Sequence, residues 1–358
     1  MLSNPFTPQN LVGRGVQLDQ VKQILAQDGD LLMTGVPGSG RHTLIRAAAQ
    51  QLGAKVLEID CLRATNSQRL LELLAEGLLN VFITPTELGL IQRWSTEQPL
   101  VLEQAGGRSR LVWHFSAGSE WNLLQALLTL PQKIAEWLNC RVVLVFQNFP
   151  HIQTWDRGGK WEHNLRQEIQ QHSRVSYALI ATVPQPWVDD SSLQVITLGP
   201  LDNHELQPWL ESSMATEGLQ FDPDGQTLFL HYVQGHLGEA IALARRIWLD
   251  CRTSGCIEIL AHQVHRSTLL LVEDLSLTFE SLILLLPPSQ VRVLESLALD
   301  PTDSPHSQEY IRKHQLSRGG SLQGALASLE QKGLVYGPEY SYRITLPLLA
   351  FWLKHRLV

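Results

Sequence analysis

The stretch LLMTGVPGSGRHTLIRAAAQQLG, Leu31–Gly53, decides the fold. It begins with a short apolar run, passes through a glycine-rich turn and continues as an alanine-rich segment. This order predicts a buried strand at Leu31–Thr34 and a helix from Arg41 to about Leu52, which ends before Gly53. A strand, a tight turn and a helix in succession are the local context of an α/β fold.

The turn itself has the composition of an anion site. Glycine lets several backbone N–H groups converge on one point, and the new helix adds the positive end of its dipole there. A strand-to-helix turn without any ligand is the alternative interpretation. The phosphate-binding interpretation assigns nucleotide contacts to Gly35, Val36, Pro37, Gly38, Ser39, Gly40, Arg41, His42 and Thr43.

Two residues of this loop depart from the usual ending, Gly-Lys followed by Ser or Thr. The usual lysine reaches the outer phosphates, and the hydroxyl after it ligates magnesium. Arg41 keeps the charge in a planar fork, whereas His42 removes the hydroxyl. Thr43 comes one position late, where the helix turns it about 100° away. We therefore expect weakened phosphate binding, and magnesium binding that is weaker still or absent.

Further apolar runs alternate with helical patterns, which predicts one parallel sheet of five strands. The interval between the second and third strands is longer than a crossover needs and predicts an insertion at about 83–118. Within it, PLVLEQAGGRSRLVWHF, Pro99–Phe115, predicts a hairpin turning at Gly106 and Gly107. The strands predicted after the first are Lys55–Asp60, Arg141–Phe146, Tyr177–Thr182 and Gln194–Leu198.

The end of the third strand tests the phosphate-loop hypothesis independently. In an ATPase with such a phosphate-binding loop, one carboxylate at the end of this strand orients magnesium and its waters, and a second activates the attacking water. Gln147 and Asn148 stand at these positions. An amide cannot accept a proton as a general base, and it holds a hard cation less well. These residues indicate a nucleotide site that has lost its chemistry, or else polar strand ends in a protein that never bound nucleotide.

After Leu198 the apolar spacing becomes helical and predicts a small all-α domain. From Pro288 the chain reads as helix, helix, turn, helix and two short strands, LVYG and YRIT, before the last helix PLLAFWLKHRL. That order predicts a winged helix-turn-helix. The expected domains are 1–198, 199–265 and 266–358.

Composition limits the partners. The net charge is −7 and the pI about 6.0, so no general attraction to nucleic acid or to an anionic membrane exists. The most apolar long run, Ser267–Leu286, carries Glu273, Asp274 and Glu280, and so predicts no membrane span. The four cysteines are few for 358 residues, which predicts a cytoplasmic protein.

The last domain has a balanced charge. From Arg266 onward, nine basic residues face nine acidic ones. Because DNA-binding domains usually carry a basic face, a protein-packing role is favoured and DNA binding stays open. The polar face of the third helix offers Ser321, Gln323, Ser328 and Gln331, and a small basic set consists of Arg312, Lys313, Arg318 and Arg343.

One cluster of possible metal ligands occurs near the end of the helical domain. Cys251, Cys256, His262 and His265 lie within fifteen residues, but their spacing departs from that of zinc sites. The stretch IEILA between them predicts a buried helix. We predict no metal site here.

The order of these motifs resembles the AAA+ and STAND P-loop ATPases, in particular the archaeal-type ATPases that end in a winged helix. The resemblance covers nearly the whole chain. It implies an α/β P-loop NTPase domain with an AAA+-like parallel five-stranded sheet, followed by an all-α lid domain and a winged helix-turn-helix domain.

The same resemblance assigns further site residues. NPFTPQNLVGRGVQLDQVKQIL resembles the adenine-contacting segment of these ATPases, with matches at Val12, Gly13 and Arg14 and with Gly15 in place of the usual glutamate. Thr182 ends the strand that carries the sensor 1 position. GHLGEAIALARR resembles the start of the sensor 2 helix, with Leu237 in place of proline and Arg245 as the candidate sensor.

The leading hypothesis is an AAA+/STAND-like protein that binds ATP or ADP with little or no hydrolysis. The nucleotide would regulate domain arrangement or the binding of an unknown protein partner. One alternative is a winged-helix DNA-binding regulator or scaffold with a vestigial loop. Another is a slow ATPase whose catalytic residue is not identified or comes from a neighbouring subunit.

Overall fold

A computed structural model describes residues 6, 11–105, 108–113, 120–188, 192–317 and 319–357. The chain divides into two compact units. The α/β unit comprises Gly15–Thr34 and Arg41–Thr197. The helical unit comprises the segment up to Arg14, the short stretch Gly35–Gly40, and the chain from Leu198 onward.

The α/β unit is built on the five-stranded sheet that the sequence predicts. Its strand order is β2-β5-β6-β1-β7, and the pairs β2–β5, β5–β6 and β6–β1 are parallel. The strands of its centre are buried along their length except for the terminal Gln147 of β5, which explains why they read as unbroken apolar runs. The five strands are β1 (Leu31–Gly35), β2 (Lys55–Asp60), β5 (Val142–Gln147), β6 (Val175–Ala181) and β7 (Gln194–Leu198).

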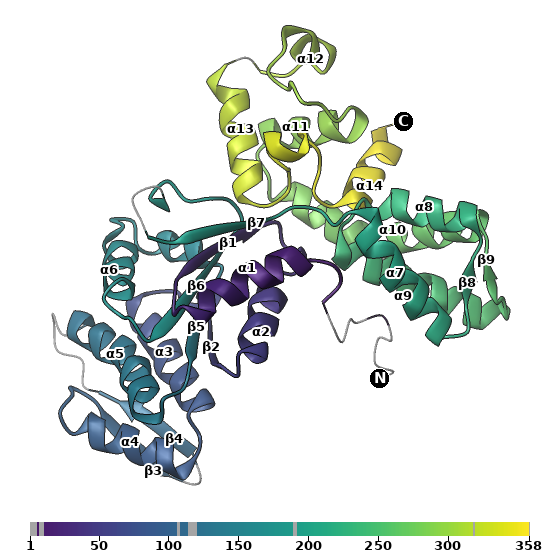
Figure 1. The fold of residues 1–358 in the computed structure, drawn as a ribbon. Coiled ribbons are helices and arrows are strands. Elements are labelled where there is room, and N and C mark those ends of the chain that lie inside the picture. Colours follow the sequence, from purple (N-terminus) through teal and green to yellow (C-terminus); the bar gives the residue numbers. More distant parts are fainter. Residues whose placement is uncertain are drawn as a thin grey trace. The chain divides into compact units, whose positions relative to one another are not determined.

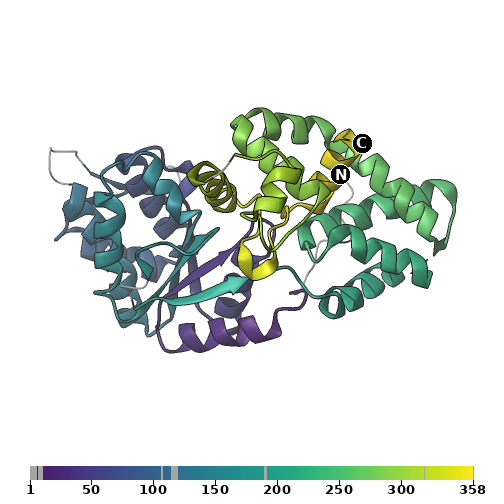
Figure 2. The same ribbon diagram turned by 90° about the horizontal axis from the view of Figure 1, so that it is seen from above.

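Helices cover both faces of this sheet. Figure 1 shows α1 and α2 on one side and α3, α5 and α6 on the other, and Figure 2 gives the view from above. The helix after β1 ends at Gln51, one residue before the predicted end at about Leu52. The left-handed Gly53, with φ 65°, terminates it, and the Gly53 N–H donates to the Gln50 carbonyl. The helices are α1 (Gly15–Ala26), α2 (Arg41–Gln51), α3 (Ser67–Val81), α5 (Glu120–Leu138) and α6 (Lys160–Ile169).

The insertion consists of α4 (Pro85–Ser95) and an antiparallel hairpin of β3 (Val101–Ala105) and β4 (Arg108–Val112). The two strands of the predicted hairpin are confirmed. Its predicted turn at Gly106 and Gly107, and its end at Phe115, lie outside the described residues.

Four helices form the first part of the helical unit around one apolar core, to which Phe6 and Val12 of the amino-terminal segment also contribute. A two-residue parallel pair, β8 (Gln220–Phe221) with β9 (Glu258–Ile259), interrupts the helices. The prediction of a helix at IEILA is therefore wrong, because Ile259 is buried in strand pairing with Phe221. The helices are α7 (Asn203–Thr216), α8 (Pro223–Val233), α9 (Leu237–Ser254) and α10 (Ala261–Leu284).

The carboxyl-terminal part has the helices that the sequence predicts and its own apolar core. The predicted wing strands, LVYG and YRIT, are wrong as continuous strands. They are reduced to isolated antiparallel bridges, Val335 with Ile344 and Tyr342 with Thr302, and a 3-10 turn at Pro338–Tyr340 lies between the two segments. The helices are α11 (Pro288–Leu299), α12 (Gln308–Lys313), α13 (Gly320–Gln331) and α14 (Pro347–Leu357).

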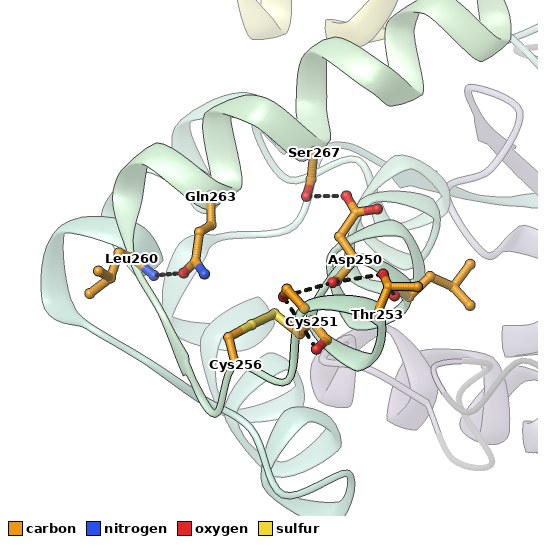
Figure 3. The surroundings of a disulfide bond; sticks show 9 residues. Asp250, Cys251, Thr253, Cys256, Leu260, Gln263 and Ser267 are labelled. Atoms are coloured by element: carbon orange, nitrogen blue, oxygen red, sulfur yellow. Dashed lines mark hydrogen bonds between the residues drawn. A yellow bond between two sulfur atoms is a disulfide. The ribbon is translucent and has the colours of Figure 1, made fainter.

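A disulfide joins Cys251 to Cys256 at the end of α9 (Figure 3). Gly255 between them is left-handed, with φ 74°, and its N–H donates to the Cys251 carbonyl. The sequence places these cysteines among possible metal ligands and does not predict their pairing. Among the described residues, no group of three or more His, Cys, Asp or Glu side chains is placed to hold a metal ion.

No helix in the described ranges is both long enough and apolar enough to cross a membrane.

Candidate nucleotide-binding site

The stretch Gly35–Gly40, here named the glycine loop, keeps backbone conformations that favour glycine. Its three glycines have φ values of 146°, 85° and 90°. A Cβ on Gly40 would meet no atom within 4 Å, so this side of the loop is open. The Ser39 Oγ is buried and has no hydrogen-bond partner in the part of the chain that the structure describes. The loop thus combines an open side with an unused polar group.

His236 is a lid residue that contacts this loop, and the sequence does not predict this contact. It precedes α9 as its N-cap, and its Nδ1 accepts the Glu239 N–H at 3.1 Å. Its Nε2 donates to the Pro37 carbonyl at 3.2 Å. Because one ring nitrogen accepts and the other donates, the imidazole is neutral. Burial agrees with this assignment, because it lowers the pKa of His236.

The His236 ring lies directly over the glycine loop. A Cβ on Gly38 would stand only 2.8 Å from the His236 Cε1, closer than real Cβ atoms approach any neighbour. Glycine is therefore required at this position while the ring stays there. The only sequence signal was a polar N-cap residue between Gly235 and Gly238, which indicates a helix start and names no partner.

Glu239 continues this set of contacts toward the winged helix. The carboxyl group is buried, with 8% of the residue exposed, and its Oε2 accepts the Leu348 N–H at 2.9 Å. Leu348 is the second residue of α14, so its N–H has no partner within the helix. Burial raises the pKa of Glu239 from 4.5 to about 8.

The raised pKa gives a prediction for Glu239→Gln. Between pH 4.5 and about 8 the unfolded chain loses the Glu239 proton while the folded chain keeps it. Stability from this group is thus fully present below pH 4.5 and is lost as the pH rises to about 8, by up to about 1.4 kcal/mol per pH unit. Glutamine still accepts the Leu348 N–H but does not titrate. We expect similar unfolding free energies for wild type and variant at pH 5, and a more stable variant at pH 8.

Urea denaturation at pH 5, 6.5 and 8 measures this difference. Glu258→Gln, at an exposed glutamate of the same unit, serves as the matched control and should change little with pH. Stability curves of Glu239→Gln and wild type that stay parallel across this range would contradict the assignment of a buried, protonated carboxyl.

The residues that resemble an adenine-contacting segment are held by the lid. Val12 is 6% exposed within the lid core. Arg14 has φ 64° and is buried; its N–H donates to Glu205 Oε1 at 2.8 Å, and its Nη2 donates to the Gly199 carbonyl. Desolvation lowers the pKa of Arg14. Gly13 has φ 63°, and a Cβ there would stand 2.8 Å from the Glu205 carboxyl, so a side chain at this junction would be strained and would displace Glu205.

In the α/β unit, the first turn of α2 engages the sheet. The Arg41 Nη1 donates to the Ala181 carbonyl at 2.7 Å, at the carboxyl end of β6. Burial lowers the pKa of Arg41 to about 10, so it stays charged at neutral pH. The His42 Nε2 lies 2.8 Å from Glu58 Oε1, and Thr43 is exposed. The position that usually supplies a magnesium hydroxyl is therefore occupied by a histidine that pairs with a carboxylate.

The amides at the end of β5 also have partners. Gln147 pairs in register with Asp60 at the end of β2. Asn148 is left-handed, with φ 53°, and its Nδ2 donates to Asp60 Oδ1 at 3.0 Å. Asp60 is a second residue that the sequence analysis missed, although KVLEID visibly ends in a carboxylate. Thr182 is half-buried and follows β6 directly, so the observed strand ends one residue before the predicted end.

Arg245, the candidate sensor 2, is exposed on α9 and makes no ion pair with any described residue. Its neighbour Arg246 lies 2.6 Å from Asp274 and 3.3 Å from Asp250. The lid residue with a hydrogen bond to the glycine loop is His236.

Two of the four basic residues expected in the winged helix have partners within it. Lys313 pairs with Asp300 at 2.6 Å, and the Arg343 guanidinium lies over the Tyr336 ring at 5.4 Å. Arg312 is exposed, and Arg318 lies outside the described residues. On α13, Ser328 already binds Gln290 and Lys332. Of the basic set expected from the sequence, Lys313 is thus paired with a carboxylate, whereas Arg343 keeps its charge over an aromatic ring.

Comparisons with known proteins agree with this architecture. Residues 277–355 match a family model described as a probable winged helix domain. A Walker-type ATPase of Pyrococcus abyssi superposes with a TM-score of 0.69 at 14% identity, covering 99% of each chain. The Orc1 protein of Aeropyrum pernix, solved in complex with DNA, superposes with a TM-score of 0.52 at 16% identity, covering 100% of this chain and 97% of that one. No curated protein matches the sequence.

At these identities the likeness establishes the fold. The chain has an AAA+-like α/β P-loop fold with a parallel five-stranded sheet, an all-α region and a winged helix. The fold class predicted from the sequence is confirmed.

Proposed function

We propose that this protein binds ATP or ADP through the glycine loop as a static ligand, with little or no hydrolysis. The observation that carries the proposal is that the phosphate-binding loop is preserved while the metal-binding and water-activating positions are not. The loop keeps its glycine conformations, its open side at Gly40 and the unpartnered Ser39 hydroxyl. The positions that would hold magnesium and activate water carry His42, whose Nε2 lies 2.8 Å from Glu58 Oε1, and Asn148, whose Nδ2 donates to Asp60.

This chemistry favours retention of nucleotide over turnover. Backbone N–H groups and a helix N-terminus attract phosphate without a metal. Magnesium prefers carboxylate and hydroxyl oxygens, which positions 42, 147 and 148 do not supply. We place Val12, Gly13 and Arg14 near the base, and Arg41, Thr182 and Arg245 near the phosphates, as the resemblance implies. The bound nucleotide would bias the arrangement of three domains, 1–198, 199–265 and 266–358.

A charge change at the open side of the loop tests nucleotide binding. Gly40→Asp introduces a carboxylate where a Cβ meets no atom within 4 Å. Repulsion between this carboxylate and the phosphates should weaken ATP affinity about tenfold, which corresponds to about 1.4 kcal/mol. Gly40→Asn has nearly the same shape and the same strain at φ 90° without the charge, so it should weaken binding much less than Gly40→Asp, and the difference between the two isolates the charge. Fluorescence titration with a labelled ATP analogue measures both.

The same samples should release no phosphate from ATP above the background. Equal affinities for Gly40→Asp and Gly40→Asn would contradict binding at the glycine loop. Steady phosphate release that Asp60→Asn abolishes would support the slow ATPase, with Asp60 as its carboxylate, over a static site.

DNA binding through the winged helix is the second candidate. It is supported by the winged helix match and by the likeness to an archaeal Orc1 protein whose structure contains DNA. The pairing of Lys313 and Arg343 within the domain weighs against it. Duplex binding that weakens steeply with salt, and that Arg312→Ala reduces, would support it. Absence of salt-dependent duplex binding would contradict this second candidate.

A further inference from the structure

We propose that His236 is a positioning residue that transmits occupancy of the glycine loop to the winged helix through Glu239 and Leu348. This inference rests on the proposed function and adds the route by which nucleotide would act on domain arrangement. All the residues of the route belong to the helical unit.

Three hydrogen bonds connect the loop to α14. The Pro37 carbonyl accepts from His236 Nε2, and His236 Nδ1 accepts from the Glu239 N–H. The Glu239 carboxyl then accepts from the Leu348 N–H. Both Glu239 and His236 are buried, at 8% and 6% exposed, so water does not replace these bonds easily. A displacement of the imidazole therefore affects the N-terminus of α14 through two hydrogen bonds, from Glu239 to His236 and from Leu348 to Glu239.

A phosphate in the loop changes the first bond. The His236 ring lies against Gly38, in the segment whose N–H groups would surround the anion. A phosphate oxygen is a stronger acceptor for the Nε2 proton than the Pro37 carbonyl, because its bond is assisted by charge. The ring therefore reorients toward the anion and leaves the Pro37 carbonyl.

The same reorientation removes the cap of α9. Once Nδ1 turns away, the Glu239 N–H in the first turn loses its acceptor, and this turn of the helix loosens. The Glu239 carboxyl lies on that turn, so its bond to Leu348 weakens as well. The winged helix is thus held to the lid when the loop is empty and is released when the loop is filled.

The Leu348 amide reports this bond directly. It lies in the first turn of α14 and has Glu239 as its acceptor, so its hydrogen exchange measures the last step of the route. We expect saturating ADP to accelerate exchange at Leu348 at least fivefold in the full chain. Exchange at Leu353, which is 2% exposed in the same helix, should stay constant, because α14 itself remains folded.

The variant His236→Asn keeps the N-cap of α9 but removes the hydrogen bond to the Pro37 carbonyl. Asparagine is a strong N-cap residue and still accepts the Glu239 N–H, but it is too short to reach the Pro37 carbonyl as well. Because it lacks the Nε2 donor, we expect His236→Asn to bind ADP more weakly than wild type and, at saturating ADP, to lose the response at Leu348. If this variant does not fold, His236→Ser provides the same comparison, since serine also caps helices and is shorter still.

The outcomes distinguish the two proposals. ADP binding to wild type without any change at Leu348 overturns the route and leaves nucleotide binding intact. A normal ADP response in His236→Asn also overturns it, because the route would then bypass the imidazole. Absence of ADP binding to wild type overturns both the proposed function and the route.

Discussion

Replacing Gly235 with alanine should cost the helical unit more than about 3 kcal/mol of unfolding free energy. Gly235 has φ 79°, a conformation that alanine adopts only with strain. A Cβ at this position would collide with the backbone of Leu201, whose N atom would be 2.9 Å away. The Leu201 N–H also donates to the Gly235 carbonyl at 3.0 Å, so the two segments cannot separate without losing that bond. Urea denaturation followed by circular dichroism measures the loss.

Gly218→Ala provides the matched control for this prediction. Gly218 has a similar φ of 74°, in the same unit, but a Cβ there would meet no atom within 4 Å. Its replacement should cost only the conformational strain, about 1 kcal/mol. Equal losses for the two variants would mean that the close approach of Gly235 to Leu201 is not what constrains the lid.

Restoring two metal ligands should make nucleotide binding depend on magnesium. In a variant with both His42→Thr and Gln147→Asp, a hydroxyl and a carboxylate return to the positions where this fold usually holds the ion. Because these groups supply the hard oxygen ligands that magnesium prefers, we expect it to strengthen ATP binding about 50-fold in the variant, and less than about threefold in wild type. Titration of ATP with magnesium and with a chelator measures this ratio.

The control for this variant carries His42→Ala with Gln147→Asn. It removes the same side chains, including the pairing of His42 with Glu58, but supplies no metal ligand. Its ATP affinity should be independent of magnesium. A similar magnesium effect in both double variants would show that positions 42 and 147 do not determine metal binding. Asn148 is left unchanged, because its left-handed conformation favours asparagine over glutamate.

The sheet could be predicted from the sequence because its central strands are buried on both faces. Runs such as RVVLVF leave little choice other than a buried strand when they are this short. The stretch IEILA was ambiguous, since five mostly apolar residues fit a helix or a strand equally well. Its pairing with Phe221, far away in the chain, decided the outcome.

The candidate site could be predicted only where its residues are adjacent in the chain. The glycine loop is such a segment, and so is the end of β5. His236 contacts Pro37 across 199 residues, and no local pattern specifies a contact of that kind. The sequence does not identify Asp60, because the metal-orienting carboxylate is expected at the end of β5, whereas this carboxylate lies on the neighbouring strand β2.

Calorimetric titration of the full chain with ADP, once with magnesium and once with a chelator, tests most directly whether a metal-independent phosphate site remains. We predict one site per chain and dissociation constants that agree within about threefold between the two conditions. Absence of binding in both conditions, or affinity that falls more than about tenfold when magnesium is removed, would contradict this prediction.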